Sequence, residues 1–421
     1  MYRKSGVALV ILLIASFLRA EDWEPDRTHA VVTGVLSWSD KGLTPFPVKN
    51  RKDMELRDLL VRRGVPQEQI TLLLDTDATR SAIVAALRTA AQRAKPGDTL
   101  IFYYAGHGAK AGRDIAFANY DIKPRDCANT GLMLSAVGDI LAKEFRGSRV
   151  ILLADACHSG GLARVADQLA KRNIASVSLT SSEACNLSTR NWTFTQAIID
   201  GLTGAALVDA NDDGKITLDE LAAEARDAMT YREGQRSGYV NRGVSGDLVL
   251  GPARRMRLAR GHGPTAVGAY VWAKNDDRFR SARIVGRDGE KYIVQFYDYT
   301  EKLERRLPAS DLKPMEFQRF PVGSRLQVQW GGRIWPAKVL DIQGAFHLVH
   351  YENFDDTWDE WVLSHRIVTA PDASVEWKGK WYPATIIKHE EGRYYIHYLG
   401  FDHSWDEWVT DKRIKLKRAQ P

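Results

Sequence analysis

The fold is predicted by two segments of the sequence, TLIFYYAGHG at residues 99–108 and RVILLADACHSGG at residues 149–161. Each begins with an uninterrupted apolar run and ends in glycines beside a polar residue. Uninterrupted apolar runs of this length are typical of strands buried in a parallel sheet. We therefore expect two strands whose ends lie at the same edge of one sheet.

On either side of these segments, apolar runs alternate with helical patterns. The candidate strands and helices are, respectively, residues 29–36, 69–74, 99–104 and 149–154, and residues 53–63, 79–94 and 135–144. Strands separated by helices predict an α/β domain with a mostly parallel sheet covered on both faces. We place this domain at residues 27–250.

Composition limits the possibilities further. A chain of 421 residues predicts two or three domains, and 44% hydrophobic with 27% charged residues indicates folded globular protein. A net charge of +6 is too small to name a nucleic-acid partner. Three cysteines are too few for a disulfide scaffold. We expect Cys157 to be the one left over, and whether Cys127 and Cys185 pair stays open.

The first twenty residues have the pattern of a secretory signal peptide. Arg3 and Lys4 precede an apolar run at residues 6–18, and Ala20 precedes acidic residues. The run is thirteen residues long, shorter than the roughly 20 residues that span a bilayer. We expect cleavage of residues 1–20 and a secreted or periplasmic protein with no membrane span left. An uncleaved anchor is the alternative.

His107 and Cys157 directly follow two of the predicted strands. If these strands are neighbours, both side chains meet at the carboxyl edge of the sheet, where α/β folds place their sites. A cysteine needs a base or a cation beside it to become a thiolate, and a helix beginning near Gly160 adds a favourable dipole. The N–H groups of Gly108 and Cys157 are candidates to polarise a scissile carbonyl. The pattern favours a His–Cys dyad over the alternative of a buried core thiol and a structural loop histidine.

The motifs YYAGHG and DACHSGG resemble the histidine and cysteine motifs of caspase-like peptidases, and of metacaspases in particular. The resemblance implies a cysteine endopeptidase with His107 as general base and acid, Cys157 as nucleophile and Gly108 in the oxyanion hole. It also implies that Asp155 lines the primary specificity pocket, so we expect cleavage after Arg or Lys. Asp53 is a candidate second pocket acid, and a surface carboxylate at a helix start is the alternative.

Residues 209–220, DANDDGKITLDE, fit the twelve-residue EF-hand loop. Gly214 allows the sharp turn and Ile216 points into the core. The candidate ligands, the one at Lys215 being its carbonyl, are Asp209, Asn211, Asp213, Lys215, Thr217 and Glu220. We expect Ca²⁺ in a structural or activating role, and an acidic turn that caps the next helix is the alternative.

After a basic linker at residues 251–264 the sequence becomes rich in Trp and Tyr, and a repeat begins. WPAKVL and YPATII lie 47 residues apart, and four pairs of aromatic residues keep the same spacing. A degenerate copy precedes them. We expect three small β-barrel modules, at residues 265–315, 321–369 and 370–418, here called module 1, module 2 and module 3.

The repeated pattern resembles Tudor-like, chromo-barrel and Agenet modules. The resemblance implies bent β-barrels that bind a peptide or nucleic acid, sometimes through aromatic cages. The candidate ligand-binding aromatics are Trp330, Tyr351, Trp358, Trp361, Trp377, Tyr398, Trp405 and Trp408. The alternative is that they form the core of a domain too small to build one from aliphatic residues. A net charge of +5 over residues 251–421 permits weak polyanion binding.

These patterns favour a secreted cysteine endopeptidase that binds calcium, acts through an acyl-enzyme and is localised by its β modules. The alternative is a non-catalytic adaptor whose modules bind a peptide or a polyanion. The presence of both His107 and Cys157 speaks against it. A thiol redox protein is disfavoured because the sequence has no Cys-x-x-Cys pair.

Overall fold

A computed structural model gives the fold of most of the chain. It describes residues 22–186, 191–255, 263–276, 278–297, 302–330, 333–368, 371–390, 392–399, 401 and 403–416. The expected signal segment at residues 1–20 and residues 256–262 of the expected linker lie outside the described residues.

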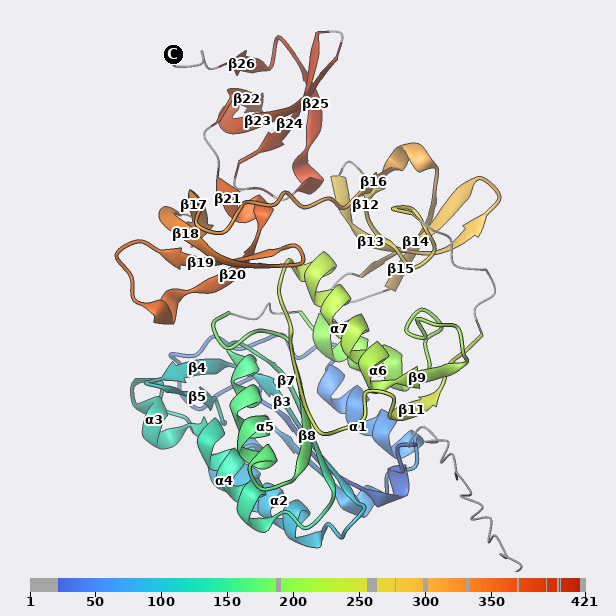
Figure 1. Ribbon diagram of the computed structural model, residues 1–421, viewed down its shortest axis with the longest axis vertical. Coiled ribbons are helices and arrows are strands. Elements are labelled where there is room, and N and C mark those ends of the chain that lie inside the picture. Colours follow the sequence, from blue (N-terminus) through green and yellow to red (C-terminus); the bar gives the residue numbers. More distant parts are fainter. Residues whose placement is uncertain are drawn as a thin grey trace, which may run out of the picture.

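The N-terminal part is built on a sheet with the strand order β10-β8-β7-β3-β1-β2 (Figure 1). Strands β2, β1, β3, β7 and β8 run parallel to one another, and β10 pairs with β8 antiparallel. Their bounds are Thr28–Gly34 (β1), Ile70–Leu74 (β2), Thr99–Gly106 (β3), Arg149–Ala156 (β7), Ala175–Thr180 (β8) and Gly238–Arg242 (β10). The mostly parallel sheet predicted from the sequence is confirmed.

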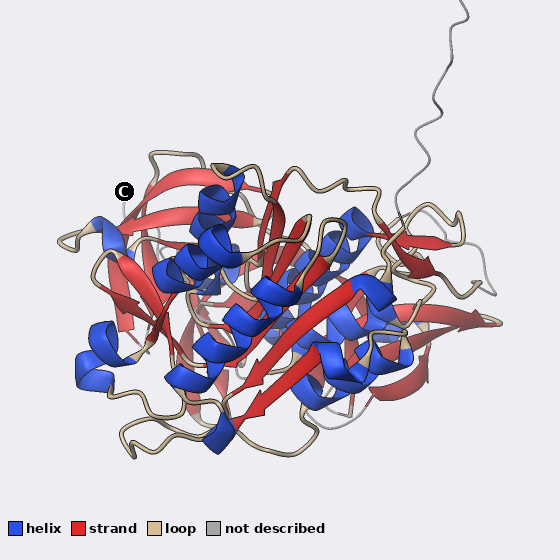
Figure 2. Cartoon of the chain, turned by 90° about the horizontal axis from the view of Figure 1, so that it is seen from below, coloured by secondary structure: helices blue, strands red, loops and turns tan. Residues whose placement is uncertain are grey.

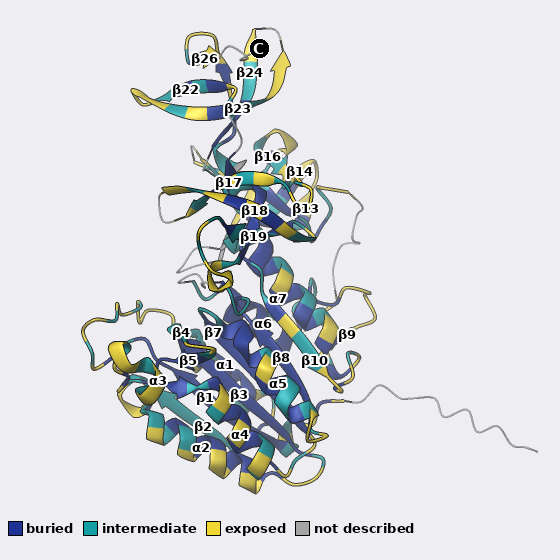
Figure 3. Ribbon diagram, turned by 60° about the vertical axis from the view of Figure 1, so that its left-hand side comes forward, coloured by how far each residue is buried: buried dark blue, intermediate teal, exposed yellow. Residues whose placement is uncertain are grey.

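Helices cover both faces of this sheet (Figure 2). Every residue of β1, β3 and β7 is buried (Figure 3). Successive strand residues point to opposite faces, so Tyr104 packs with α2, α4 and α5, whereas Tyr103 packs with α1, α6 and α7. The helices are Lys52–Arg62 (α1), Arg80–Arg93 (α2), Cys127–Thr130 (α3), Leu134–Glu144 (α4), Leu162–Ala170 (α5), Thr193–Leu202 (α6) and Leu218–Glu233 (α7).

Two small sheets complete this domain. The sheet β4-β5-β6 begins one residue after His107, and β9 pairs with β11. The pairing of β11 extends the domain into the first two residues of the expected linker. The bounds of these strands are Gly108–Ala111 (β4), Asp114–Phe117 (β5), Leu132–Met133 (β6), Lys215–Thr217 (β9) and Val249–Pro252 (β11).

Each C-terminal module is a five-stranded antiparallel sheet, and the three sheets share one strand order. The second strand of each carries a register shift at the equivalent place, after Ile284, Val339 and Ile386. Such a shift bends the strand. In none of the three does the described chain pair the two outermost strands, so the small β modules that we expected are open half-barrels.

The three modules use equivalent segments. In module 1 the strands are Tyr270–Asn275 (β12), Arg278–Asp288 (β13), Lys291–Tyr297 (β14), Lys302–Leu307 (β15) and Leu312–Pro314 (β16). In module 2 they are Arg325–Trp330 (β17), Arg333–Gln343 (β18), Phe346–Tyr351 (β19), Glu360–Leu363 (β20) and Ile367–Val368 (β21). In module 3 they are Ala373–Trp377 (β22), Lys380–Glu390 (β23), Arg393–Tyr398 (β24), Glu407–Thr410 (β25) and Ile414–Leu416 (β26).

Modules 1 and 2 contact the α/β domain, and module 3 contacts module 1. Arg283 of module 1 makes a buried ion pair with Glu224 of α7, with 2.6 Å between Nη1 and Oε1. Lys313 of module 1 donates a hydrogen bond of 2.7 Å to the carbonyl oxygen of Asp406 in module 3. Figure 1 shows this arrangement, with modules 1 and 2 above the α/β domain and module 3 beyond them.

Two further findings concern the whole described chain. None of its helices is both long and apolar enough to cross a membrane. No disulfide joins Cys127 to Cys185, so the pairing left open from the sequence does not occur in this structure.

Candidate active site

The sheet brings the His107 and Cys157 loops into contact. Strands β3 and β7 stay in register to their last residues, where Gly106 lies opposite Ala156. His107 and Cys157 are the next residue on each strand. A side chain at Gly108 would place its Cβ atom 1.9 Å from the carbonyl oxygen of Cys157, so only glycine fits between the two loops.

The imidazole of His107 is held by aromatic rings and one carbonyl group. Its ring centroid lies 4.5 Å from that of Trp38 and 4.4 Å from that of Phe46. Its Nε2 atom lies 2.9 Å from the carbonyl oxygen of Thr44. Because a carbonyl oxygen only accepts hydrogen bonds, Nε2 carries the proton and Nδ1 is the nitrogen able to accept one. This tautomer suits a general base.

The turn after Cys157 has an unusual backbone. His158 has a φ of 56°, in the left-handed region that residues other than glycine seldom adopt. Its backbone N–H donates to the carbonyl of Asn186 at 2.8 Å, and Nδ1–H donates to that of Ala184 at 2.9 Å. Burial lowers the pKa of His158. His158 is therefore bound to the loop after β8, which leaves His107 as the better candidate for the base.

Asp155 lies two residues before the candidate nucleophile and is almost fully buried. It accepts hydrogen bonds from Thr195, of 2.7 Å from Oγ1 and 3.3 Å from the backbone N–H. Burial raises the pKa of Asp155 to about 6, although the bonds from Thr195 act in the opposite direction. Asp155 is therefore a buried carboxyl whose charged form a partner cation would favour.

Asp53, the other candidate pocket acid, is fully buried and paired with a cation from its own chain. The Arg51 guanidinium donates to its Oδ2 at 2.7 Å, and the Met54 N–H donates to its Oδ1 at 2.7 Å. Arg51 also bonds to Asp75 and donates to the carbonyl of Gly34. Asp53 is thus neither a surface carboxylate nor an isolated pocket acid. Arg51 was not among the predicted site residues, since one arginine among several gives no pattern.

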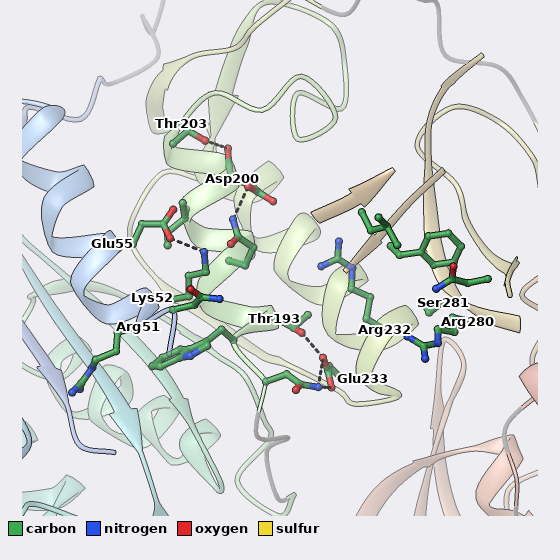
Figure 4. Close-up of a pocket in the computed structure, with 18 of the residues that line it drawn as sticks. Arg51, Lys52, Glu55, Thr193, Asp200, Thr203, Arg232, Glu233, Arg280 and Ser281 are labelled. Carbon is green, nitrogen blue, oxygen red and sulfur yellow. Dashed lines mark hydrogen bonds and ion pairs between the residues drawn. The ribbon is translucent and has the colours of Figure 1, made fainter. Parts of the chain in front are cut away.

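A cavity of about 750 Å³ lies between the α/β domain and module 1 (Figure 4). Arg51 lines one side, while Thr193 and Glu233 form a hydrogen bond at another. Arg232 and Arg280 face the same space. Neither His107 nor Cys157 lines this cavity.

The predicted calcium loop has the expected backbone turn. Gly214 has a φ of 84° and Ile216 is fully buried. Glu220 accepts from the backbone N–H of Thr217 and that of Ala210, at 2.9 and 2.8 Å, so its two oxygens are held by the loop itself. Within the described residues, no three His, Cys, Asp or Glu side chains gather so that they could hold a metal ion. Calcium binding therefore stays a prediction.

The candidate aromatic residues fall into two groups. In module 2, Trp330 and Trp358 pack edge to face at 5.5 Å between ring centroids. Their repeat partners Trp377 and Trp405 pack in the same way at 5.3 Å. The hydroxyl groups of Tyr351 and Tyr398 bond to Glu360 and Glu407 in the modules' interiors.

Trp361 and Trp408 lie outside these clusters. Trp361 is buried beside Cys185 of the α/β domain. Trp408 is 38% exposed and packs on Tyr395. The structure therefore does not bring these two residues to the paired tryptophans with which the sequence analysis grouped them.

Comparison with known proteins gives two family matches. Residues 53–166 match the model of the metacaspase peptidase C14 domain. Residues 371–416 match the Tudor-knot model, described as an RNA binding activity-knot of a chromodomain. The first match contains the candidate dyad, and the second covers most of module 3.

Individual relatives agree with the first match. Metacaspase-1 of Schizosaccharomyces pombe is 31% identical over 121 residues, covering 26% of this chain and 28% of that protein. A Trypanosoma brucei brucei protein named inactive metacaspase-4 is 32% identical over 116 residues, covering 24% of this chain and 33% of that protein. This chain thus spans about a third or less of the length of these curated relatives.

Among solved structures, Caspase-1 from Spodoptera frugiperda is similar with a TM-score of 0.36 and 14% identity, covering 60% of this chain and 99% of that one. The fold of this chain is given by its own strands and helices and does not depend on this similarity. The two family matches give a metacaspase peptidase C14 domain at residues 53–166 and a Tudor-knot domain at residues 371–416.

Proposed function

We propose that the chain is a cysteine endopeptidase that cleaves after Arg or Lys through a His107–Cys157 dyad. The peptidase C14 domain supports a cysteine protease. The observation that carries the proposal is the hydrogen bond between Nε2 of His107 and the Thr44 carbonyl, since it leaves Nδ1 able to accept a proton, on a loop that lies against the Cys157 loop.

The reaction would proceed by acyl transfer. Nδ1 of His107 takes the thiol proton, and the Cys157 thiolate attacks the scissile carbonyl carbon. The N–H groups of Gly108 and Cys157 stabilise the oxyanion, and His107 returns the proton to the leaving amine as the C–N bond breaks. Water then hydrolyses the thioester, with His107 as base, and releases the acid product and the free thiol.

Asp155 is the carboxylate that would read a basic side chain before the cut. Burial deprives the charged form of Asp155 of its stabilisation by water, and the guanidinium or ammonium group of a substrate side chain would stabilise that form instead. Asp53 is already neutralised by Arg51, so it contributes little net charge to the pocket. We therefore assign the preference for Arg or Lys to Asp155, with Asp53 as a supporting group.

The test is hydrolysis of fluorogenic peptides that vary the residue before the cut. Wild type should cleave peptides with Arg or Lys there, and Cys157→Ala and His107→Ala should not. Cleavage after Asp would overturn the pocket assignment. One relative is named inactive, and silence of a folded sample across the whole panel would favour the adaptor function.

For the modules, we propose binding of a peptide or a polyanion at the Trp330 and Trp358 pair of module 2. The two residues are 36% and 45% exposed, so a pair of adjacent aromatic rings reaches solvent. Titration of the full chain with an anionic oligomer or a lysine-rich peptide should quench tryptophan fluorescence. In Trp358→Ala this quenching should be weaker. Unchanged quenching in that variant would contradict the assignment.

We further propose export and calcium binding. The apolar run at residues 6–18 supports export, and a mature N-terminus near Glu21 is the result expected from N-terminal sequencing. The turn at Gly214 supports calcium binding in loop 209–220. Calorimetry should show Ca²⁺ binding that Asp209→Ala and Glu220→Ala remove, and its absence in wild type would end this part of the proposal.

A further inference from the structure

Module 2 lies against the loop that follows β8, residues 181–186, which borders the candidate nucleophile. Nδ2 of Asn186 donates to the carbonyl of Trp361 at 2.9 Å, and its Oδ1 accepts from the N–H of Trp361 at 3.2 Å. These are the bonds that a neighbouring strand would make at the outer edge of β20. Asn186 is only 5% exposed, so this joint is sealed from water.

The ring of Trp361 fixes the same joint from a second direction. The guanidinium of Arg236 lies 4.1 Å from the centroid of the indole. Arg236 also donates to Gln343 of module 2 at 2.5 Å and lies 3.4 Å from the carboxylate of Glu183 in the loop. Cys185 packs into the apolar cluster that contains Trp361. Module 2 therefore contacts the loop directly at Cys185 and Asn186, and Arg236 links it to Glu183.

The loop in turn holds the backbone around Cys157. The carbonyl groups of Asn186 and Ala184 accept the two hydrogen bonds from His158, whose backbone is left-handed. Gly160 lies so close to Ala184 that an added Cβ would approach its nitrogen to 2.4 Å. One continuous series of contacts thus runs from Trp361 through Asn186 to His158, the residue next to Cys157.

We propose that Asn186 and Trp361 are positioning residues, through which module 2 holds the Cys157 turn in its reactive geometry. The proposal rests on the peptidase function proposed above. Neither residue touches the reacting atoms, and the bonds of Asp155 to Thr195 do not involve module 2. Loss of the joint should therefore lower kcat and leave KM for a basic peptide unchanged.

The experiment compares full-length wild type with Asn186→Ala, Trp361→Ala and the matched control Trp408→Ala. Trp408 occupies the repeat position of Trp361 but lies on an exposed face of module 3. Three quantities are measured: kcat and KM for an Arg peptide, and the rate at which iodoacetamide alkylates Cys157, followed by peptide mass spectrometry to separate it from Cys127 and Cys185.

A displacement of about 1 Å at a reacting group can cost about a hundredfold in rate. We expect Asn186→Ala and Trp361→Ala to lower kcat and the alkylation rate by about tenfold or more, with KM within about twofold. Trp408→Ala should leave all three within about twofold. Wild-type rates in Asn186→Ala, or equal losses in Trp361→Ala and Trp408→Ala, would overturn the proposal.

Arg236→Ala serves as a second variant if Trp361→Ala unfolds module 2, because Arg236 belongs to the α/β domain and contributes nothing to the module's core. It should also slow alkylation. The alkylation rate needs no substrate, so it separates two failures. If wild type alkylates no faster than His107→Ala, the peptidase function is wrong. If it does and Asn186→Ala matches wild type, only the positioning role is wrong.

Discussion

Modules 2 and 3 are copies of one repeat, yet they contact the rest of the chain through different aromatic residues. Module 2 buries Trp361 on the α/β domain and leaves Trp358 45% exposed. Module 3 leaves Trp408 exposed, and Arg278 of module 1 lies 5.3 Å from the ring centroid of its Trp405. The repeat therefore encodes the inside of each module, whereas the surroundings decide which aromatic residue is covered.

The interiors of the two modules differ only in degree. Glu360 is bound by Tyr351 and Arg366, and Glu407 is bound by Tyr398 and Arg413 at the equivalent positions. The side chain of Glu360 is 12% exposed, whereas that of Glu407 is 33% exposed. A charge that loses its partner costs more where less water can reach it.

The largest expected difference in stability between the two modules therefore follows from removing the arginine that pairs with this glutamate. Arg366→Ala should destabilise module 2 by about 2 kcal/mol, and Arg413→Ala should destabilise module 3 by about 1 kcal/mol or less. Hydrogen exchange of β19 and β24 in the full chain measures both losses. In Arg366→Ala we expect the amides of β19 to exchange about thirtyfold faster than in wild type. Equal acceleration in the two strands would show that the difference in exposure has no energetic meaning.

A smaller difference is expected for the paired tryptophans. Trp405→Ala removes a half-buried ring that contacts Arg278, and we expect a loss of about 1–2 kcal/mol in module 3. Trp358→Ala removes an exposed ring and should cost about 0.5 kcal/mol. Thermal unfolding followed by tryptophan fluorescence tests the pair. A larger loss in Trp358→Ala would mean that module 2 relies on this ring for its own core.

The smallest expected effect concerns pH and should be the same whichever module is altered. The pKa of Asp155 is raised to about 6 by burial, so this carboxyl loses its charge as the pH falls through that value. Its neutral form attracts a basic side chain less, so KM for an Arg peptide should rise severalfold between pH 7 and pH 5.

The control is the pair Trp361→Ala and Trp408→Ala, which should both keep this KM profile because neither ring contacts Asp155 or Thr195. A KM that is flat from pH 5 to 7, or a profile that only Trp361→Ala shifts, would separate Asp155 from substrate recognition.

The sequence predicts the parallel sheet and the adjacency of His107 and Cys157 because both depend on local patterns. Apolar runs mark the strands, and residues that follow parallel neighbours meet at one edge. The repeat spacing of 47 residues likewise predicts that modules 2 and 3 share one pattern of strands. These features need no knowledge of which distant surfaces touch.

Asn186 and Arg51 show where such reasoning ends. Asn186 is a single polar residue whose partner, Trp361, lies 175 positions away. Arg51 neutralises Asp53 only because the chain turns before α1 so that both reach Gly34. The repeat predicts small β modules, but strand pattern does not reveal whether the outer strands of a small sheet meet, and in the described chain they do not. Contacts of this kind depend on the complete fold.

The central claim is that Cys157 is a nucleophile activated by His107. The most direct test is the rate of Cys157 alkylation by iodoacetamide against pH, in full-length wild type and in His107→Ala. The account predicts a reactive thiolate in wild type well below the ordinary cysteine pKa of about 8.5, and a return toward that value in the variant. The same profile in both proteins would contradict it and favour the adaptor.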